Sequence, residues 1–240
     1  MNLALLGYGR MGQEVQQQAE QRGHTITAVF DIDKPFTSSA KLNGAEAIIS
    51  FTLADTVIPN LQAAAKLGIP IVEGTTGWLD RFGEAEAIDG LTLVYSPNFS
   101  IGVYVFTQAV REAARLMAPL DEYDCYLHEW HHTGKVDSPS GTAVRLADVL
   151  LAELPQKQKA LYETSHEKID PKHLHVTSTR VGRVPGTHQV GFDGEVDSIE
   201  LKHTAHGRQG FALGAVRAAE WVAGKTGIFS MDDFMQSLQS

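Results

Sequence analysis

The chain has 240 residues, of which 43% are hydrophobic and 20% charged, and its formal net charge is −9. These values are typical of a globular protein with one large or two small domains, and the negative charge disfavours binding to nucleic acid. No apolar run reaches the roughly 18 residues of a membrane span, and the N-terminus lacks the features of a signal peptide. Cys125 is the only cysteine, which excludes an intrachain disulfide, so we expect a protein of the reducing cytoplasm.

Short apolar runs alternate with helical patterns over residues 1–99. Strands are predicted at residues 3–6, 26–30, 47–51, 69–72 and 91–95. Helices are predicted between them at residues 11–21, 54–67 and 79–87. Gly23, Gly68 and Gly90 follow helix-like stretches, where a left-handed C-cap favours glycine. This alternation predicts an α/β domain with a parallel sheet covered on both faces.

The pattern changes after residue 99. Helices are predicted over 100–117 and 142–154, and strands over 123–130, 173–181, 187–192 and 195–205. Strands that follow one another without helices predict a mixed sheet and hence a second, α+β domain. An amphipathic helix over 211–222 is expected to pack back on the first domain. The predicted domains are therefore residues 1–99 with 211–240, and residues 100–210.

A glycine-rich turn follows the first predicted strand and opens the first helix. It contains Gly7, Tyr8, Gly9, Arg10, Met11 and Gly12. In a GxGxxG turn the first glycine permits a tight bend, the second lets the backbone approach a pyrophosphate, and the third allows close helix packing. Asp31 follows the second strand at the position of a ribose-binding carboxylate. Together these features predict a dinucleotide site.

The identity of Asp31 also bears on the choice of cofactor. A carboxylate accepts hydrogen bonds from the 2′-hydroxyl of NADH and repels the 2′-phosphate of NADPH. Ile32 and Asp33 follow it, and the nearest cation along the chain is Lys34. We therefore expect NADH to be preferred, with NADPH possible.

Two further turns follow the fourth and fifth strands, at the edge where parallel sheets bind ligands. The first contains Gly74, Thr75 and Thr76, and the second contains Ser96, Pro97, Asn98 and Phe99. Their small and hydroxylated residues suit contact with a ribose or a nicotinamide. Ordinary strand-to-helix turns are the alternative interpretation.

The segment from His128 to Thr142 contains the densest set of chemically active residues. Its first five residues formally match the HExxH zinc motif, which requires two histidines on one face of a helix. The preceding residues alternate as a strand, and Gly134 follows almost at once. His128 and His132 would then lie too far apart to hold one ion, so we expect no metal.

The same segment suits the reduction of an anionic substrate. Ser138 or Ser140 can cap the helix that follows, with Pro139 near its first turn, and N–H groups there favour a carboxylate. Lys135 adds a positive charge, and His131 and His132 can supply a proton near neutral pH. A solvated basic loop before a capped helix is the alternative.

The sequence closely resembles the 4-hydroxy-tetrahydrodipicolinate reductase (dihydrodipicolinate reductase) family of the bacterial diaminopimelate–lysine pathway. The resemblance spans essentially the whole chain. It rests on GYGRMG at Gly7–Gly12, GTTG at Gly74–Gly77, PNFS at Pro97–Ser100 and, above all, HHTGKVDSPSGTA at His131–Ala143. VPGTH at Val184–His188 and the helix at Phe211–Trp221 agree with it.

This resemblance implies a Rossmann domain completed by the C-terminal helix, a central substrate and tetramerisation domain, and reduction of a small cyclic dicarboxylate with NAD(P)H. It implies that His131 is the general acid/base and Lys135 the second proton donor. His132, Ser140, Gly141 and Thr142 would bind the substrate. Cofactor contacts would come from Gly7–Gly12, Asp31, Gly74–Thr76, Ser96–Phe99 and, with a less specific match, Arg208. The family often has a basic residue after the acid on the second strand, where this chain has Ile32.

Two other classes of protein share some of these features. A relative of the aspartate or homoserine dehydrogenases would share the first domain, but it would not account for the loop after His131. A non-catalytic dinucleotide sensor would lack proton donors near the nicotinamide and typically carries a DNA-binding module. The net charge of −9 does not favour such a module.

Overall fold

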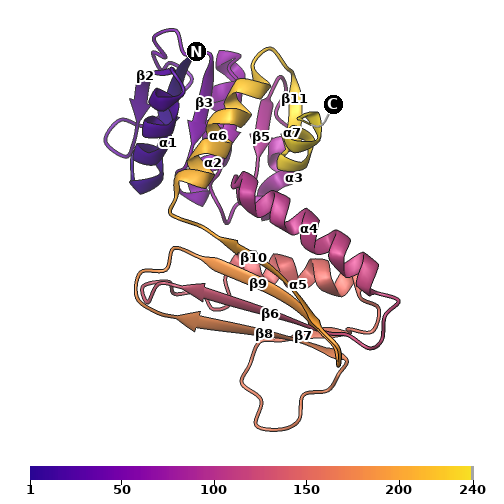
Figure 1. Ribbon diagram of the computed structural model, residues 1–240. Helices are drawn as coiled ribbons and strands as arrows, with labels where there is room; N and C mark the ends of the chain where they lie inside the picture. Colours follow the sequence, from indigo (N-terminus) through magenta and orange to yellow (C-terminus); the bar gives the residue numbers. More distant parts are fainter. Residues whose placement is uncertain (239–240) are drawn as a thin grey trace. The chain divides into compact units, whose positions relative to one another are not determined.

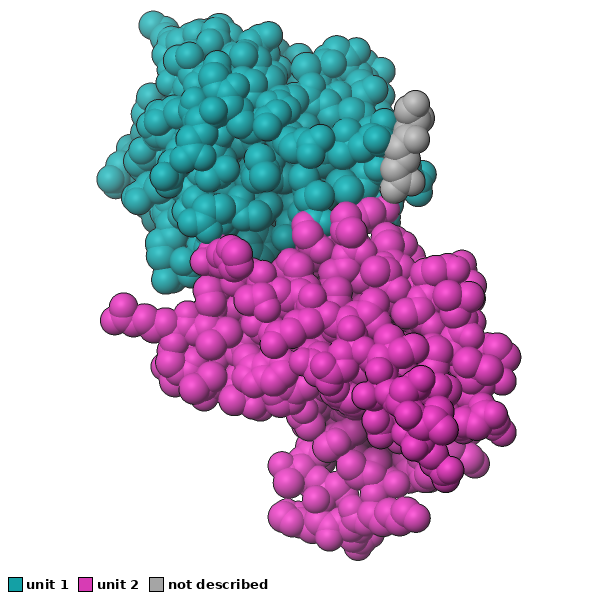
Figure 2. All heavy atoms as spheres, viewed as in Figure 1, with its two compact units in different colours: residues 1–101, 208–240 teal, residues 102–207 magenta. Residues whose placement is uncertain are grey.

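The computed structural model describes residues 1–238, which form two compact units (Figures 1 and 2). Unit 1 contains Met1–Ile101 and the chain from Arg208 onward, and unit 2 contains Gly102–Gly207. Each unit has a sheet and a hydrophobic core of its own. Within residues 1–238, no helix has the length and apolar character needed to cross a membrane.

Unit 1 is built on a six-stranded parallel sheet in the order β11-β5-β4-β3-β1-β2. Its strands are β1 (Asn2–Leu6), β2 (Thr25–Phe30), β3 (Ala47–Ser50), β4 (Ile71–Glu73), β5 (Thr92–Tyr95) and β11 (Gly227–Ser230). The central strands β3 and β4 are buried along their whole length because helices cover both faces of the sheet.

The helices of unit 1 form two layers (Figure 1). One layer pairs α1 (Arg10–Gln21) with α6 (Gln209–Val222), and α6 also packs against the central strands. The other layer contains α2 (Ala54–Leu67), the short 3-10 helix η1 (Leu79–Arg81) and α3 (Phe82–Glu86). Because successive strand residues point to opposite faces, Ile48, Ile71 and Leu93 join the core beneath α2.

Unit 2 contains a five-stranded mixed sheet in the order β10-β9-β6-β8-β7. Its strands are β6 (Asp124–His131), β7 (Lys159–Leu161), β8 (His173–Arg180), β9 (Thr187–Asp193) and β10 (Ser198–Thr204). Strands β6, β8 and β7 run parallel, whereas β9 is antiparallel to both β6 and β10. The helices α4 (Ile101–Met117) and α5 (Gly141–Glu153) supply the core on one face. The predicted fold class, a parallel-sheet α/β domain with a second mixed-sheet domain, is confirmed.

Three short elements were not predicted: β7, β11 and α7 (Met231–Ser237). Strand β11 owes its conformation to pairing with β5, which is distant in the sequence. The prediction of one helix over 79–87 was wrong in detail, since that segment divides into η1 and α3. Of the two serines predicted as possible caps, Ser140 caps α5, and Pro139 directly precedes this cap.

Candidate functional site

The glycine turn of unit 1 joins β1 to α1. Gly7 has a φ of +83°, and a Cβ atom there would lie 2.2 Å from the carbonyl oxygen of Phe51. A Cβ at Gly12 would lie 2.1 Å from the carbonyl oxygen of Gly7, whereas one at Gly9 would meet nothing within 4 Å. Gly7 and Gly12 thus permit the bend and the close packing of α1. The space beside Gly9 leaves the start of α1, which no side chain caps, open to an anionic group.

Asp31 lies beside this turn. Its Oδ2 accepts a hydrogen bond from the backbone N–H of Tyr8 at 3.0 Å, and its Oδ1 accepts one from the N–H of Ile32 at 2.9 Å. The ammonium group of Lys34 lies over the ring of Phe30, 4.9 Å from its centroid. A carboxylate therefore stands next to the glycine turn, as a site for a ribose with free hydroxyl groups requires.

The turns after β4 and β5 end at the same edge of the sheet. Gly74 is buried, and a Cβ there would lie 2.2 Å from the ring of Phe51. Thr75 is held by its neighbours, because its Oγ1 accepts a hydrogen bond from the N–H of Thr52 at 2.9 Å. Thr76 and Pro97 are exposed, whereas Ser96 and Phe99 are buried and Asn98 is half-buried. The sheet thus brings all the predicted cofactor turns of strands β1, β2, β4 and β5 to one edge.

Arg208 lies at the start of α6 and is exposed. A Cβ at Gly210 would lie 3.3 Å from the Oγ of Ser100, so this end of α6 is next to the turn that follows β5. The structure therefore places Arg208 on the side of unit 1 where the predicted cofactor turns end.

Glu73, at the end of β4, was not predicted. Its side chain is fully buried, and its Oε1 accepts a hydrogen bond from the N–H of Thr75 at 2.8 Å. Neither its Oε2 nor the neighbouring Oγ of Ser50 has a hydrogen-bond partner among the described residues. Burial raises the pKa of Glu73 to about 7, although the hydrogen bond from Thr75 and the nearby hydroxyl group of Ser50 act in the opposite direction.

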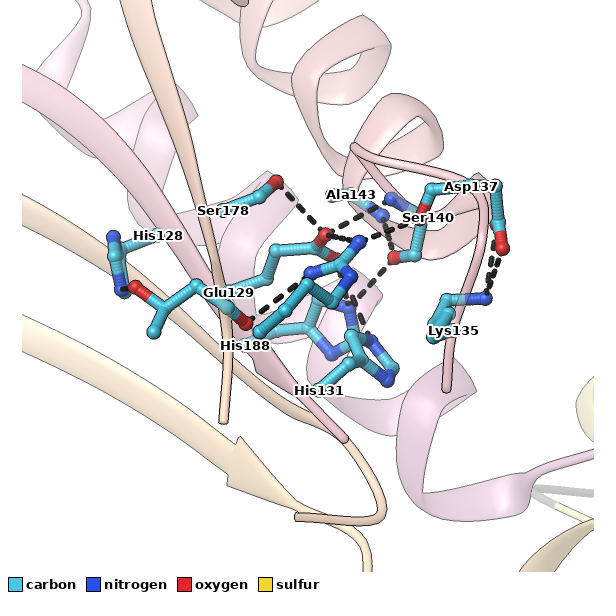
Figure 3. Close-up of polar contacts among 11 residues, drawn as sticks. His128, Glu129, His131, Lys135, Asp137, Ser140, Ala143, Ser178 and His188 are labelled. Carbon is cyan, nitrogen blue, oxygen red and sulfur yellow. Dashed lines mark hydrogen bonds and ion pairs between the residues drawn. The ribbon is translucent and has the colours of Figure 1, made fainter. Parts of the chain in front are cut away.

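In unit 2 the predicted loop connects β6 to α5 (Figure 3). His131 is the last residue of β6 and is buried. Ser140 is the N-cap of α5, and its Oγ accepts a hydrogen bond from the N–H of Ala143 at 3.2 Å. Gly141 and Thr142 form the start of the helix, with Gly141 exposed. The backbone N–H groups at this helix start suit a carboxylate ligand.

Glu129 connects the two ends of this loop, and the sequence prediction missed it. Its side chain is completely buried, and its Oε1 accepts three hydrogen bonds of 2.9–3.0 Å. The donors are the backbone N–H of Ser140, the Oγ of Ser178 and the Nη2 of Arg180. Alternation along β6 could have revealed it, because residues 129 and 131 of a strand share one face.

The second oxygen of Glu129 lies between two imidazoles. Its Oε2 is 3.4 Å from the Nε2 of His131 and 3.4 Å from the Nε2 of His188. Burial by itself would raise the pKa of Glu129, but the nearby imidazoles of His131 and His188 and the hydrogen bonds from Ser140 and Ser178 hold it below its ordinary value. The carboxyl group is therefore ionised and acts only as an acceptor.

His188 is the last residue of the VPGTH motif, and the sequence did not predict it as a site residue. It comes from β9, directly opposite Glu129 in the antiparallel pairing with β6. Its Nε2 lies 3.2 Å from the Oγ of Ser140, and its ring centroid is 5.4 Å from that of His131. His188 thus contacts both the His131 end and the helix-cap end of the loop. Only the pairing of β6 with β9 brings it there.

Lys135 and His132 lie in the middle of the loop. The Nζ of Lys135 contacts both carboxylate oxygens of Asp137, at 2.8 and 2.9 Å. Figure 3 shows this pair to one side of the Glu129 cluster. His132 is half-buried, and its carbonyl oxygen accepts a hydrogen bond from the N–H of Lys135 at 3.1 Å. Asp137 thus holds Lys135 by an ion pair that a substrate carboxylate would have to replace.

The HExxH motif begins on a strand and not on a helix, which is the element that the zinc motif requires. His128 lies on β6, where its Nδ1 contacts the Oγ1 of Thr177 and its ring packs on Trp130. A different set, Glu129, His131 and His188, places three possible ligand atoms within 4.8 Å of one another. The guanidinium of Arg180 already binds the same carboxylate, and its positive charge opposes a metal ion there. The donor set fits a hydrogen-bonded cluster better than a cation.

Two family models and the curated relatives point to one family. Its models match residues 1–99, as dihydrodipicolinate reductase, N-terminus, and residues 102–235, as dihydrodipicolinate reductase, C-terminus. The 4-hydroxy-tetrahydrodipicolinate reductase of Christiangramia forsetii is 40% identical over 99% of both chains. That of Archaeoglobus fulgidus is 37% identical over 98% of this chain and 100% of the relative. Dipicolinate-bound dihydrodipicolinate reductase from Paenisporosarcina sp. TG-14 has a similar fold, with a TM-score of 0.74 at 22% identity over 96% of this chain and 97% of that one.

Proposed function

Because this chain belongs to the dihydrodipicolinate reductase family, we propose that it reduces 4-hydroxy-tetrahydrodipicolinate to tetrahydrodipicolinate in diaminopimelate and lysine biosynthesis. The observation that carries this proposal is the cluster in unit 2. There Glu129 joins a buried histidine, His131, to Ser140 at the start of α5. A proton donor and an anion-binding helix start are thereby parts of one polar cluster.

The residues of unit 1 fit a nicotinamide dinucleotide. The open space at Gly9 and the uncapped start of α1 suit the pyrophosphate, and Asp31 suits a ribose. When bound, the reduced nicotinamide supplies a hydride. The other cofactor contacts that we assign are Gly7–Gly12, Gly74–Thr76, Ser96–Phe99 and Arg208.

NADH is the cofactor that these residues favour. Asp31 carries a negative charge beside the glycine turn, and Ile32 follows it in place of a cation. This carboxylate would repel a 2′-phosphate placed against it, so NADPH should be the poorer of the two cofactors. Comparison of kcat/KM for the two cofactors tests the preference, and an equal or higher value with NADPH would contradict it.

His131 donates the proton in this proposal, and Lys135 is the second donor. The substrate is a small cyclic dicarboxylate. One of its carboxylates binds at Ser140, Gly141 and Thr142 together with His132. The N–H of Ser140 is already bonded to Glu129, so its hydroxyl group and the next residues of α5 supply the binding contacts. A second carboxylate would compete with Asp137 for Lys135.

We also propose that the chain forms a homotetramer through unit 2. Among the described residues, no helix covers the face of the mixed sheet opposite to α4 and α5. That face carries Tyr126, which donates to Glu200 at 3.0 Å, and Trp130, whose ring lies under the ammonium group of Lys202. Aromatic rings with polar partners are typical of interface residues. Sedimentation equilibrium tests this, and a monomer at micromolar concentration would contradict it.

The same proposal places the enzyme in the cytoplasm and gives it small molecules as its partners. Its substrate and cofactor are anionic metabolites, and the proposed function involves neither nucleic acid nor a membrane. The net charge of −9 agrees with the absence of a nucleic-acid partner from this proposal.

The test of the proposed function is a coupled assay. The substrate is generated in the cuvette by the preceding synthase, and NADH consumption is followed by its absorbance at about 340 nm, with a reaction that lacks the synthase as the control. We expect consumption that depends on both proteins. No turnover with either NADH or NADPH would contradict the proposal.

A further inference from the structure

The two oxygens of Glu129 have different partners. Oε1 accepts the three hydrogen bonds from Ser140, Ser178 and Arg180. Oε2 has no such donor and faces only the Nε2 atoms of His131 and His188, at 3.4 Å each. Hydrogen bonds between catalytic groups are often long without substrate and shorten when it binds. Figure 3 shows the two imidazoles converging on this carboxylate.

We propose that Glu129 is a positioning residue that determines which ring nitrogen of His131 can give its proton to the substrate. This inference deepens the proposed function and rests on it. An ionised carboxylate can only accept, so the Nε2 of His131 must carry a hydrogen toward Glu129. The proton for the substrate therefore leaves from Nδ1, and His188 holds the same oxygen of Glu129 in place.

The proton balance of the step is simple. Before the step His131 is an imidazolium, with a hydrogen on each ring nitrogen. The Nδ1–H bond breaks as a new bond forms between that proton and the atom that receives it, and His131 becomes a neutral imidazole. Its remaining hydrogen is on Nε2, bonded to Glu129, and water returns a proton to Nδ1 afterwards. The carboxylate stabilises the imidazolium and remains ionised throughout, as in a Ser-His-Asp triad.

Gly186 lies against the ring of His131. A Cβ at this position would lie 2.8 Å from the Cε1 of His131, 3.3 Å from its Nδ1 and 3.6 Å from its Nε2. The residue also has a φ of +155°. A side chain here would press on the Cε1 corner of the ring, between its two nitrogens, so glycine leaves room for the imidazole in this position.

Substitution of Glu129 by glutamine gives a sharp test. The three donors at Oε1 require an acceptor, so the amide oxygen must take that position and the amide NH₂ must face the two histidines. An N–H that points at Nε2 forces the neutral ring of His131 into the Nδ1–H tautomer. We expect Glu129→Gln to lower kcat by about 10³–10⁴-fold, as the corresponding change does in a Ser-His-Asp triad, with KM changed less than about threefold.

The matched control is Glu153→Gln. Glu153 likewise faces more than one basic side chain, with its carboxylate oxygens 3.7 Å from the Nε of Arg111 and 3.5 Å from that of Arg115, but it lies on α5 outside the site. We expect its kcat to remain within about twofold of the wild-type value. If Glu129→Gln keeps kcat within threefold, or loses activity only through KM, the proposal is wrong.

A tautomer measurement on the wild-type protein needs no variant at Glu129. Long-range ¹⁵N–¹H spectra distinguish Nε2–H from Nδ1–H imidazoles, and His131→Gln identifies the signal. We expect the Nε2–H form in the wild type and the Nδ1–H form in Glu129→Gln. The Nδ1–H form in the wild type would overturn the proposal, even if Glu129→Gln fails to fold. A wild-type protein with the Nε2–H tautomer and no turnover would instead contradict the proposed function alone.

Discussion

The two units each bury one glutamate completely, and the two carboxyl groups behave in opposite ways. Glu73 in unit 1 has one backbone donor, from Thr75, and an Oε2 without a hydrogen-bond partner among the described residues. Burial raises the pKa of Glu73 to about 7. Glu129 in unit 2 is buried as deeply, yet its donors hold its pKa below the ordinary value against the effect of burial.

The difference shows that the donors around a buried carboxyl group, and not burial alone, decide its charge. Burial penalises the ionised form in both units, and only the guanidinium, imidazole, hydroxyl and amide groups around Glu129 outweigh that penalty. Glu129 is therefore a permanent acceptor that can orient a histidine. Glu73 sits beneath the predicted cofactor turn and changes charge near neutral pH.

The largest expected effect is the loss of the Glu129 carboxylate. Glu129→Ala leaves Arg180 and two histidines around a buried void, and loss of one partner of a buried ion pair costs about 3–5 kcal/mol. Urea unfolding at pH 7 should show this decrease in the free energy of unfolding. Glu153→Ala, a partly exposed ion-pair control, should cost about 1 kcal/mol or less. Equal decreases in the free energy of unfolding for the two variants would contradict the difference between a buried and a partly exposed carboxylate.

Glu73 should affect stability in the opposite direction. Its pKa is raised in the folded state, so its contribution is favourable below the ordinary value of 4.5 and is lost as the pH rises through about 7. At about 1.4 kcal/mol for each unit, the loss is roughly 3 kcal/mol by pH 8. Glu73→Gln should therefore be little different from wild type near pH 5 and more stable by that amount at pH 8.

Unfolding by urea at several pH values between 5 and 8 measures this trend. Glu86→Gln, on the exposed side of α3, is the control and should show no such dependence. A difference between Glu73→Gln and wild type that stays constant across this range would contradict a raised pKa at Glu73.

The smallest effect is expected at Glu220, a partly exposed carboxylate that joins α6 to the end of α1. Arg22 donates to both of its oxygens at 2.8 Å, and the Nε2 of His24 lies 2.6 Å away. Burial would raise the pKa of Glu220, but these partners lower it, so its contribution is present above about pH 4.5 and is lost as the pH falls below. With 27% of the side chain exposed, Glu220→Gln should cost roughly 0.5–1 kcal/mol at pH 7.

The dependence of stability on salt concentration distinguishes Glu220 from Glu129. The cost of Glu220→Gln should shrink in about 1 M NaCl because solvent ions screen an exposed pair, whereas the cost of Glu129→Ala should remain. Thermal unfolding at low and high salt makes the comparison. A salt-independent cost at Glu220 would show that the pair acts by packing instead.

The features that the sequence predicted correctly depend on residues that are close together in the chain. The roles of Gly7 and Gly12 follow from a turn and the helix beside it, and Ser140 is recognisable as a cap from its neighbours. Glu129 and His188 escaped prediction because their meeting depends on the register of β6 against β9. Glu73 was missed for a related reason. An acidic residue at the end of a strand is usually exposed, and only the assembled sheet shows that this one is buried.

The central claim is that unit 2 supplies the proton through His131. The most direct measurement is the steady-state kinetics of His131→Gln in the coupled assay, with His128→Gln on the opposite face of β6 as the matched control. We expect kcat to fall by about 10²–10³-fold for His131→Gln with KM nearly unchanged, as for removal of a general acid, and little change for the control. A raised KM with an unchanged kcat would make His131 a binding residue and contradict the account.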